Sequence, residues 1–184
     1  MLNIPNSISL LRICLVPLAV WLIISGKFQA AFIVFVIAGL SDAADGYIAK
    51  RFGMKTVLGS YLDPLADKLL LVSIYITLGT LGEIPSWLVI LIVSRDILII
   101  SGFVLSWMLD HPFAIDPALI SKANTALQII LAAVVLGAMG FEIDFRVMRI
   151  FLIYLTGALT LMSASFYLLS WLRHMSDYEN SELK

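Results

Sequence analysis

The chain alternates between long apolar runs and short charged segments. After residue 12, seven windows of eleven or more residues contain no Asp, Glu, Lys or Arg, namely residues 13–26, 28–41, 69–82, 84–94, 97–109, 123–141 and 150–172. Two of these windows flank Arg95 and Asp96, and joining them leaves six stretches. Each stretch approaches the roughly 20 residues that cross a bilayer when charged ends lie at the interface. The pattern therefore predicts an all-α fold with six transmembrane helices.

Prolines and polar residues refine the ends of these elements. Proline is tolerated in the first turn of a helix, where its missing N–H is not needed. Four prolines lie near predicted helix starts: Pro5, Pro64, Pro85 and Pro117. Residues 3–12 are expected to form a short interfacial helix that leads into the first span. No internal repeat or change of composition divides the chain, so we expect a single domain, residues 1–184, with a polar, frayed tail from about residue 175.

Composition places these elements in a membrane. Of the 184 residues, 61% are hydrophobic and only 14% are charged, against about 25% charged in ordinary soluble domains, so a water-soluble globule is excluded. Cys14 is the only cysteine, so no internal disulfide can form. The net charge of −1 argues against a basic surface, and we expect no nucleic-acid partner. A polytopic membrane protein remains.

The basic residues predict an orientation. Eight of the twelve Lys and Arg residues fall on one side of the predicted spans, three fall on the other, and Arg95 lies within a span. The eight are Arg12, Lys50, Arg51, Lys55, Lys68, Lys122, Arg173 and Lys184. The positive-inside rule places their side, with both termini, in the cytoplasm. The short chain and the lack of a presequence favour a bacterial inner membrane.

Residues 41–68 are the hardest part of the chain to explain as a membrane anchor, because they hold four of its thirteen acidic residues. On a helical wheel, Asp45 lies about 60° from Asp42. Gly46 and Ala49 lie within about 40° of Asp42 on the same wheel. One narrow face at the end of the second predicted helix thus carries two carboxylates and two residues of minimal bulk.

The third predicted helix carries a matching pair. Asp63 and Asp67 are one turn apart, offset by about 40°, and Gly59 lies one turn earlier. Two consecutive helix ends would bring the four carboxylates together, and like charges in an apolar protein cannot stay unpaired. Two divalent cations would neutralise them, and all-oxygen ligands favour Mg²⁺ or Mn²⁺ over Zn²⁺. Since the small residues leave room for phosphate groups, the spacing predicts a two-metal phosphoryl-transfer site.

Other interpretations stay open at this point. Interfacial loops are rich in charge, and neighbouring cations could simply pair with the aspartates; these cations are Lys50, Arg51, Lys55 and Lys68. A small cation or metabolite transporter is an alternative of another class, but transporters usually place polar sites near mid-membrane and show repeats. Carboxylates gathered at one membrane face, without a repeat, favour an enzyme. A receptor or assembly subunit would leave the spacing of the aspartates unexplained.

At these residues the sequence resembles the CDP-alcohol phosphotransferase family, whose signature reads D-x-x-D-G-x-x-A-R, eight further residues, then G-x-x-x-D-x-x-x-D. The fixed positions fall on Asp42, Asp45, Gly46, Ala49, Lys50, Gly59, Asp63 and Asp67. All match except one, where Lys50 stands in place of the family arginine and offers phosphate a point charge rather than a planar fork. The resemblance extends over the whole chain, including its NIPNSISLLR opening.

The resemblance implies a six-helix membrane domain, usually a homodimer, in which a hydroxyl displaces CMP from a CDP-linked substrate. By position, it implies that two divalent cations, Mg²⁺ or Mn²⁺, are bound by Asp42, Asp45, Asp63 and Asp67. It also implies that Asp67 is the general base that takes the proton of the acceptor's hydroxyl. The nucleotide would lie against Gly46, Ala49, Lys50 and Gly59.

Other segments indicate the acceptor. The Asn-x-Pro-Asn opening, SRD at 94–96 and ISKANTALQ at 120–128 resemble the branch that transfers phosphatidyl from CDP-diacylglycerol to glycerol-type acceptors. Within it, the ISK-x-NT-x-x-Q pattern is more similar to cardiolipin synthases than to phosphatidylglycerophosphate synthases, which tend to show G-K-x-K-T and a further arginine after the fourth-helix charge pair. Residues 97–108 carry no charge. Phosphatidylglycerol is therefore the expected acceptor and glycerol 3-phosphate the alternative.

Basic residues outside the signature are candidates to bind the acceptor or a lipid phosphate. They are Arg95, Lys122 and Arg51. Arg95 and Asp96 lie about ten residues into the fourth predicted span, where an isolated charge costs several kcal/mol. Either they form an ion pair with each other or with another helix, or Arg95 faces the cavity and binds a phosphate.

Overall fold

A computed structural model of the chain describes residues 4–51, 57–108 and 119–182, and within them it contains six α-helices and no strand. Side chains are described for residues 11–41, 66, 68–102 and 119–172. The helices are α1 (Ile4–Ile24), α2 (Phe28–Arg51), α3 (Val57–Thr80), α4 (Ser86–Met108), α5 (Leu119–Phe141) and α6 (Arg146–Glu182). The predicted all-α fold is confirmed.

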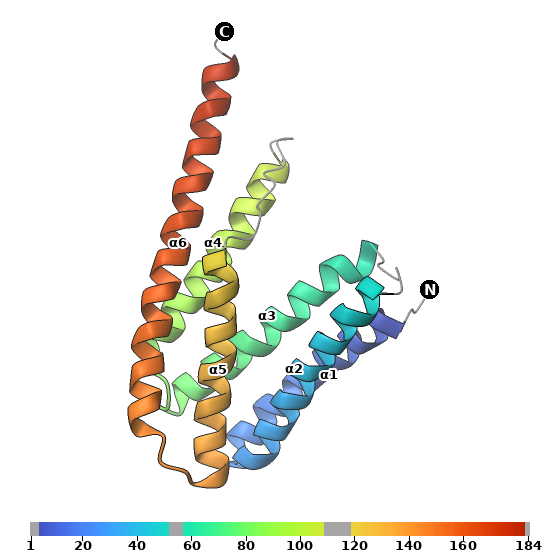
Figure 1. Cartoon of the computed structure of the whole chain (residues 1–184), viewed down its shortest axis with the longest axis vertical. Coiled ribbons are helices and arrows are strands. Elements are labelled where there is room, and N and C mark those ends of the chain that lie inside the picture. The colour runs from blue at the N-terminus through green and yellow to red at the C-terminus, as the bar shows by residue number, and fades with distance from the viewer. Residues whose placement is uncertain (1–3, 52–56, 109–118, 183–184) are drawn as a thin grey trace.

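The helices form two groups that share α5 (Figure 1). Helix α1 packs against α2 and α3, and α4 packs against α6. Helix α5 contacts both groups, because it packs against α2 on one side and α6 on the other. The core between them is continuous and apolar, and its largest fully buried members include Tyr75, Leu88 and Leu131. Successive helices run in opposite directions, so the end of α2 and the beginning of α3 lie at the same end of the bundle (Figure 1).

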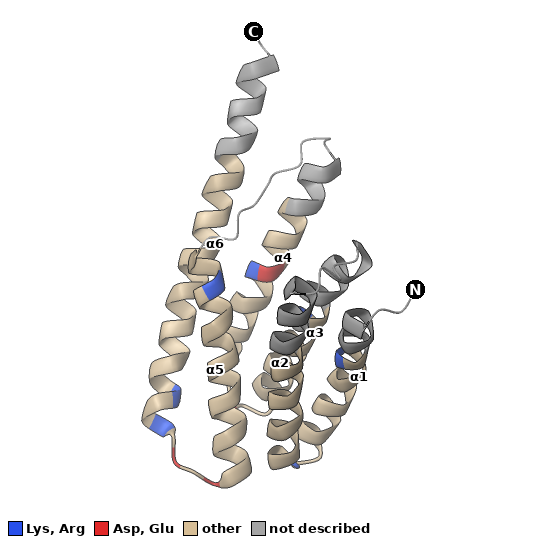
Figure 2. Cartoon of the chain, turned by 45° about the vertical axis from the view of Figure 1, so that its right-hand side comes forward, with Lys and Arg blue, Asp and Glu red and all other residues tan. Residues whose placement is uncertain are grey.

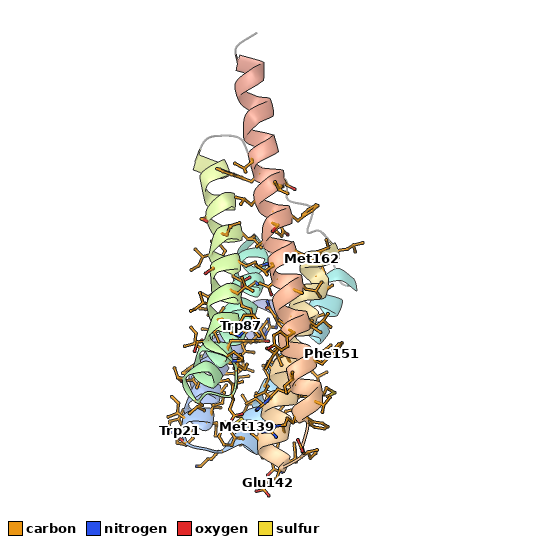
Figure 3. All side chains as sticks on the ribbon, turned by 90° about the vertical axis from the view of Figure 1, so that its left-hand side faces the viewer. Trp21, Trp87, Met139, Glu142, Phe151 and Met162 are labelled. Atoms are coloured by element: carbon orange, nitrogen blue, oxygen red, sulfur yellow. The ribbon has the colours of Figure 1, made fainter. Side chains whose placement is uncertain are left out.

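The outer surface of the bundle carries many large apolar side chains. Large hydrophobic side chains are exposed along all six helices, and Figure 3 shows them projecting from the ribbon, with Trp21, Phe151 and Met162 among them. Soluble monomers rarely expose apolar patches larger than a few hundred Å². This surface fits a membrane protein.

Two helices are long and apolar enough to cross a bilayer within the described residues, Leu119–Phe141 and Arg146–Leu172. Shorter apolar helical stretches occupy Leu11–Ile24, Phe28–Ser41 and Lys68–Thr80. The acidic residues shorten the apolar parts of α2 and α3. The apolar stretch of α2 ends at Ser41, just before Asp42, and that of α3 begins at Lys68, just after Asp67. Six helices are confirmed, and two of them are clear candidate spans.

Two sequence expectations about helix ends were wrong. The interfacial helix predicted at residues 3–12 is not a separate element, because α1 runs without a break from Ile4 to Ile24. Pro64 lies inside α3, which already begins at Val57. The polar tail from about residue 175 belongs to α6, which continues to Glu182, and its fraying stays a prediction. No glycine or proline interrupts this last stretch, so a helix already formed by the preceding span can extend through it.

Glycines allow close approaches between helices. A Cβ on Gly140, near the end of α5, would lie 2.8 Å from both the Cα and the backbone nitrogen of Gln29 at the beginning of α2. A Cβ on Gly157 in α6 would lie 2.9 Å from the ring of Trp87 in α4. The first approach involves backbone, which cannot move aside as a side chain can. Gly140 therefore sets the distance between α2 and α5.

We expect Gly140→Ala to lower the free energy of unfolding by about 1–3 kcal/mol, because the methyl group pushes two packed backbones apart. Gly39→Ala is the matched control, since a Cβ there would meet nothing within 4 Å. It should raise the stability by roughly 0.5–1 kcal/mol through helix propensity alone. Unfolding in mixed detergent micelles, followed by circular dichroism, measures both. Equal stabilities for the two variants would contradict the close approach.

Candidate functional site

The four aspartates of the signature lie on consecutive helices. Asp42 and Asp45 belong to the C-terminal part of α2, and Asp63 and Asp67 to the N-terminal part of α3. Only residues 52–56 separate the two helices. The side chains of all four aspartates lie outside the described residues, so their convergence stays a prediction.

The remaining signature positions lie on the same two helices. They are Gly46, Ala49 and Lys50 on α2, with Arg51 as its last residue, and Gly59 on α3. Their side-chain surroundings also lie outside the described part of the chain. Where side chains are described, no group of three or more His, Cys, Asp and Glu residues could hold a metal ion.

The chemistry of the donor set decides whether divalent cations fit here. The end of α2 and the beginning of α3 offer four carboxylates, with no His or Cys between residues 41 and 68. Such oxygen ligands suit Mg²⁺ or Mn²⁺. The residues therefore fit a pair of hard divalent cations.

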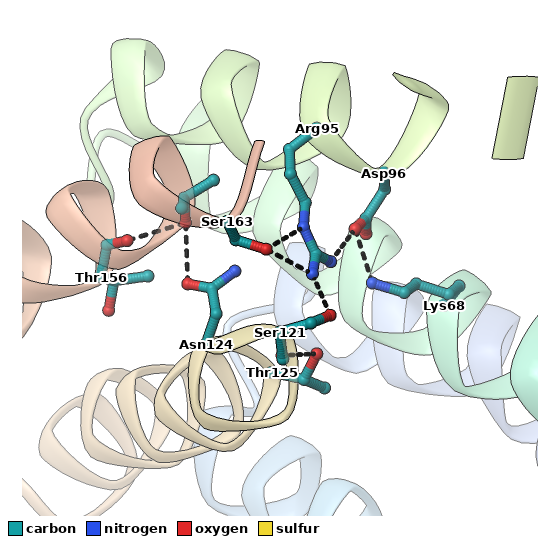
Figure 4. A network of polar contacts seen from close by, with 9 residues as sticks. Lys68, Arg95, Asp96, Ser121, Asn124, Thr125, Thr156 and Ser163 are labelled. Carbon is teal, nitrogen blue, oxygen red and sulfur yellow. Dashed lines mark hydrogen bonds and ion pairs between the residues drawn. The ribbon is translucent and has the colours of Figure 1, made fainter. Parts of the chain in front are cut away.

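A buried ion network lies beside these helix ends. The Lys68 ammonium on α3 donates to Asp96 Oδ1 on α4 at 2.6 Å, and Arg95 Nη1 donates to the same oxygen at 2.7 Å (Figure 4). Arg95 is 2% exposed and Asp96 is 6% exposed. Both lie near the middle of α4 (Figure 2). Because Lys68 directly follows Asp67 in the sequence, the network reaches the chain immediately next to the predicted base.

Two serines complete the network from the other helices. Ser163 Oγ on α6 accepts from Arg95 Nε at 3.2 Å and from Nη2 at 3.0 Å. Ser121 Oγ on α5 also accepts from Arg95 Nη2. The Arg95 guanidinium carbon lies 5.9 Å from the ring centroid of Tyr167. We call Lys68, Arg95, Asp96, Ser121 and Ser163 the four-helix junction, because they join α3, α4, α5 and α6.

Polar contacts continue along α5 and α6. The Thr160 hydroxyl donates to Asn124 Oδ1 at 2.9 Å, and both residues are fully buried. The Tyr75 hydroxyl on α3 donates to the backbone oxygen of Gln128 at 3.0 Å. Among the described residues, Asn124 Nδ2 and Gln128 Nε2 are buried without a hydrogen-bond partner. Buried amide groups of this kind are the usual binding points of internal water.

An apolar groove of about 270 Å³ opens between α2, α3 and α5. Its α2 wall extends to Leu40, two residues before Asp42. Its α3 wall starts at Leu70, three residues after Asp67. The lining of the groove therefore stops two to three residues along the chain from the nearest carboxylates.

The two described phosphate candidates have different surroundings. The Arg95 guanidinium is enclosed by Asp96, Ser121 and Ser163, which is the interhelical arrangement that the sequence left open as one alternative. Lys122 is exposed near the beginning of α5. The sequence did not identify Lys68 as the partner of Asp96, because the two residues are 28 positions apart. The signal available was the need of a buried Asp96 for a cation from a neighbouring helix.

Known proteins are similar to this chain over most of its length. Cardiolipin synthase (CMP-forming) of Rattus norvegicus is 40% identical over 156 residues, which cover 76% of this chain and 52% of the rat protein. CDP-diacylglycerol--glycerol-3-phosphate 3-phosphatidyltransferase 1, chloroplastic, of Oryza sativa subsp. japonica is 36% identical over 152 residues, covering 73% of this chain and 46% of the rice protein.

The chain spans about half the length of these curated relatives. A probable cardiolipin synthase (CMP-forming) of Drosophila melanogaster is 32% identical over 186 residues, covering 92% of this chain and 58% of the fly protein. The sequence profile described as CDP-alcohol phosphatidyltransferase matches residues 2–169. Because this match covers nearly the whole chain, the protein belongs to the CDP-alcohol phosphatidyltransferase family.

Proposed function

We propose that the protein is a phospholipid-synthesising enzyme that transfers phosphatidyl from CDP-diacylglycerol to the hydroxyl of a glycerol-type acceptor and releases CMP. The observation that carries this proposal is the placement of the family's four aspartates on the end of α2 and the beginning of α3, which only residues 52–56 separate. Family membership also leaves the transporter alternative without support.

The proposed roles follow from the chemistry of each group. Asp42, Asp45, Asp63 and Asp67 would hold two divalent cations, Mg²⁺ or Mn²⁺. These ions would stabilise negative charge on the diphosphate and on the departing CMP. Asp67 takes the proton of the acceptor's hydroxyl as that oxygen attacks the phosphorus of the phosphatidyl group.

The nucleotide is proposed to approach the backbone where side chains are small. Gly46, Ala49 and Gly59 leave room for the cytidine and pyrophosphate, and Lys50 supplies a positive charge toward phosphate. Arg51 is a further candidate for a lipid or acceptor phosphate at the end of α2.

The apolar groove supports a lipid as the donor. Its walls, from Phe35 to Leu40 on α2 and at Leu70 and Leu71 on α3, would bury part of an acyl chain while the diphosphate stays at the helix ends. Burial of apolar surface is worth about 25 cal/mol per Å². Such a groove would hold the tail of CDP-diacylglycerol and direct its headgroup toward the aspartates.

The acceptor is proposed to be phosphatidylglycerol, with glycerol 3-phosphate as the alternative. Relatives of both kinds match the chain, and the rat protein is the more similar of the two described above. Arg95 is enclosed by the four-helix junction, which favours a structural role for it, whereas Lys122 is exposed and remains a candidate for an acceptor phosphate.

We further propose that all six helices lie in the cytoplasmic membrane of a bacterium, with the aspartates facing the cytoplasm, and that the protein is a homodimer. The exposed apolar side chains along all six helices support membrane insertion. Lys27 directly precedes α2, and Arg146 and Arg149 lie in the first turn of α6, which begins at the end of the bundle where α2 begins (Figure 1). Fewer cations at this end agree with the proposed orientation. Chemical crosslinking in native membranes tests the dimer.

Asp67→Asn should lower the rate of CMP release by roughly 10²–10⁴-fold, because the variant loses the base for the acceptor's proton. CMP release from CDP-diacylglycerol is measured with purified protein in micelles, with and without EDTA. Asp144→Asn is the matched control. Asp144 lies exposed before α6, where it accepts a hydrogen bond from the Arg146 backbone, and an asparagine can keep that bond. Near-normal turnover by Asp67→Asn, or turnover that survives EDTA, would reject the assigned roles.

The acceptor is identified by offering phosphatidylglycerol and glycerol 3-phosphate separately with CDP-diacylglycerol and Mn²⁺. We expect cardiolipin to form with the first, and no phosphatidylglycerophosphate with the second. Mass spectrometry of the extracted lipid distinguishes the two products. The reverse result would assign glycerol 3-phosphate as the acceptor, and CMP release without a new lipid would contradict transfer to either alcohol.

A further inference from the structure

We propose that Asp96 acts through Lys68 as a positioning residue for the carboxylates of α3. In this role the four-helix junction fixes the rotation of α3 about its own axis, and thereby the direction in which Asp63 and Asp67 project. The inference rests on the proposed function, because it concerns the same carboxylates.

The contact between Lys68 and Asp96 is well placed for this task. Lys68 follows Asp67 directly on α3, so the two positions are about 100° apart on a helical wheel. The Lys68 ammonium reaches across to Asp96 on α4 at 2.6 Å. A rotation of α3 that redirects Asp67 would have to break this ion pair.

Asp96 can serve as an anchor because it is itself held. Its Oδ1 also accepts from Arg95 Nη1 at 2.7 Å, and Arg95 is in turn bonded to Ser121 on α5 and Ser163 on α6. The anchor is thus attached to three helices other than α3. Asp96 and Arg95 are both more than nine-tenths buried, where water cannot replace a lost partner.

A purely electrostatic role of Lys68 makes the opposite prediction. If the ammonium only added positive charge near the carboxylates, its removal would strengthen cation binding. If Lys68 positions α3, its removal weakens cation binding, because the carboxylates lose their shared direction. The sign of the change therefore separates positioning from through-space electrostatics.

The test is Mn²⁺ binding by the purified full-length protein in nanodiscs, measured by titration of the Mn²⁺ paramagnetic resonance signal without any lipid substrate. We expect Lys68→Met to weaken Mn²⁺ binding about 10-fold, the lower end of the usual effect of losing a group that orients a metal ligand. Lys68→Arg, which can still donate to Asp96, should bind Mn²⁺ within about 2-fold of the parent protein. Lys68→Met binding that is unchanged or tighter would overturn the proposal.

A double-mutant cycle tests the path through Asp96. We expect Asp96→Asn also to weaken Mn²⁺ binding, and the double variant with Lys68→Met to be no weaker than the weaker single variant. If the factors by which the two single substitutions weaken Mn²⁺ binding multiply in the double variant, the two residues act independently, and this result overturns the proposed path. If Asp96→Asn does not fold, the Lys68 pair of variants alone decides, since Lys68 is partly exposed and its loss leaves the Arg95 contact to Asp96 in place.

The Glu83–Arg149 ion pair provides the matched control, because it joins the α3–α4 connection to the beginning of α6, beyond the end of α3 that is farther from Asp63 and Asp67. Glu83→Gln should lower thermal stability and leave Mn²⁺ binding unchanged. Weaker Mn²⁺ binding by this variant would mean that any loosening of the bundle weakens binding, and the proposal would fail.

The test of the positioning role can be separated from the test of the proposed function. If Asp67→Asn binds Mn²⁺ as well as the parent protein, the proposed function fails. If Lys68→Met binds Mn²⁺ normally while Asp67→Asn binds it more weakly, only the positioning role is rejected.

Discussion

The pairing of buried charge in an apolar bundle is the constraint on which this structure depends. Removing one member of a buried ion pair costs about 3–5 kcal/mol, because the other member stays unpaired away from water. Arg95 and Asp96 lie in the apolar helix α4, so each must find partners within the protein. Their partners come from α3, α5 and α6, and the two groups of helices therefore meet at one polar point.

The other contacts between the helices need not fix their relative rotation, because the directional hydrogen bonds of this junction do so. Van der Waals contacts between apolar helices are poorly directional, and the outer surface is also apolar, so hydrophobicity alone does not distinguish inside from outside. Gly140 and Gly157 set close distances between helices, and buried hydroxyls such as that of Thr160 link α5 to α6. Distances come from small residues, whereas relative rotation comes from hydrogen bonds with a defined direction.

The sequence predicted well what depends on local pattern. Runs without charge gave the six helices, and the proline before Ser86 marked the beginning of α4. The helix start predicted near Pro64 was wrong, because α3 begins earlier, at Val57, and accommodates the proline inside the helix. The junction could be foreseen only in part. A charged pair inside a span signals the need for partners, but the choice of Lys68 and two serines depends on how helices far apart in sequence come together. The signature aspartates were found from spacing alone, and their side-chain arrangement remains a prediction.

The charges also explain why the proposed cation site would be separate from the junction. The junction holds two cations and one carboxylate, Lys68, Arg95 and Asp96, and so carries one net positive charge. One positive charge cannot neutralise four carboxylates, and the Arg95 guanidinium already donates to Asp96 and to the two serines. Converging carboxylates on α2 and α3 would still repel one another unless additional cations were bound between them. The protein's own lysines and arginines could neutralise such a cluster only by filling the space that a diphosphate requires. The proposed nucleotide site would therefore be better served by exchangeable divalent ions, while the fixed charges of the junction hold the helices together.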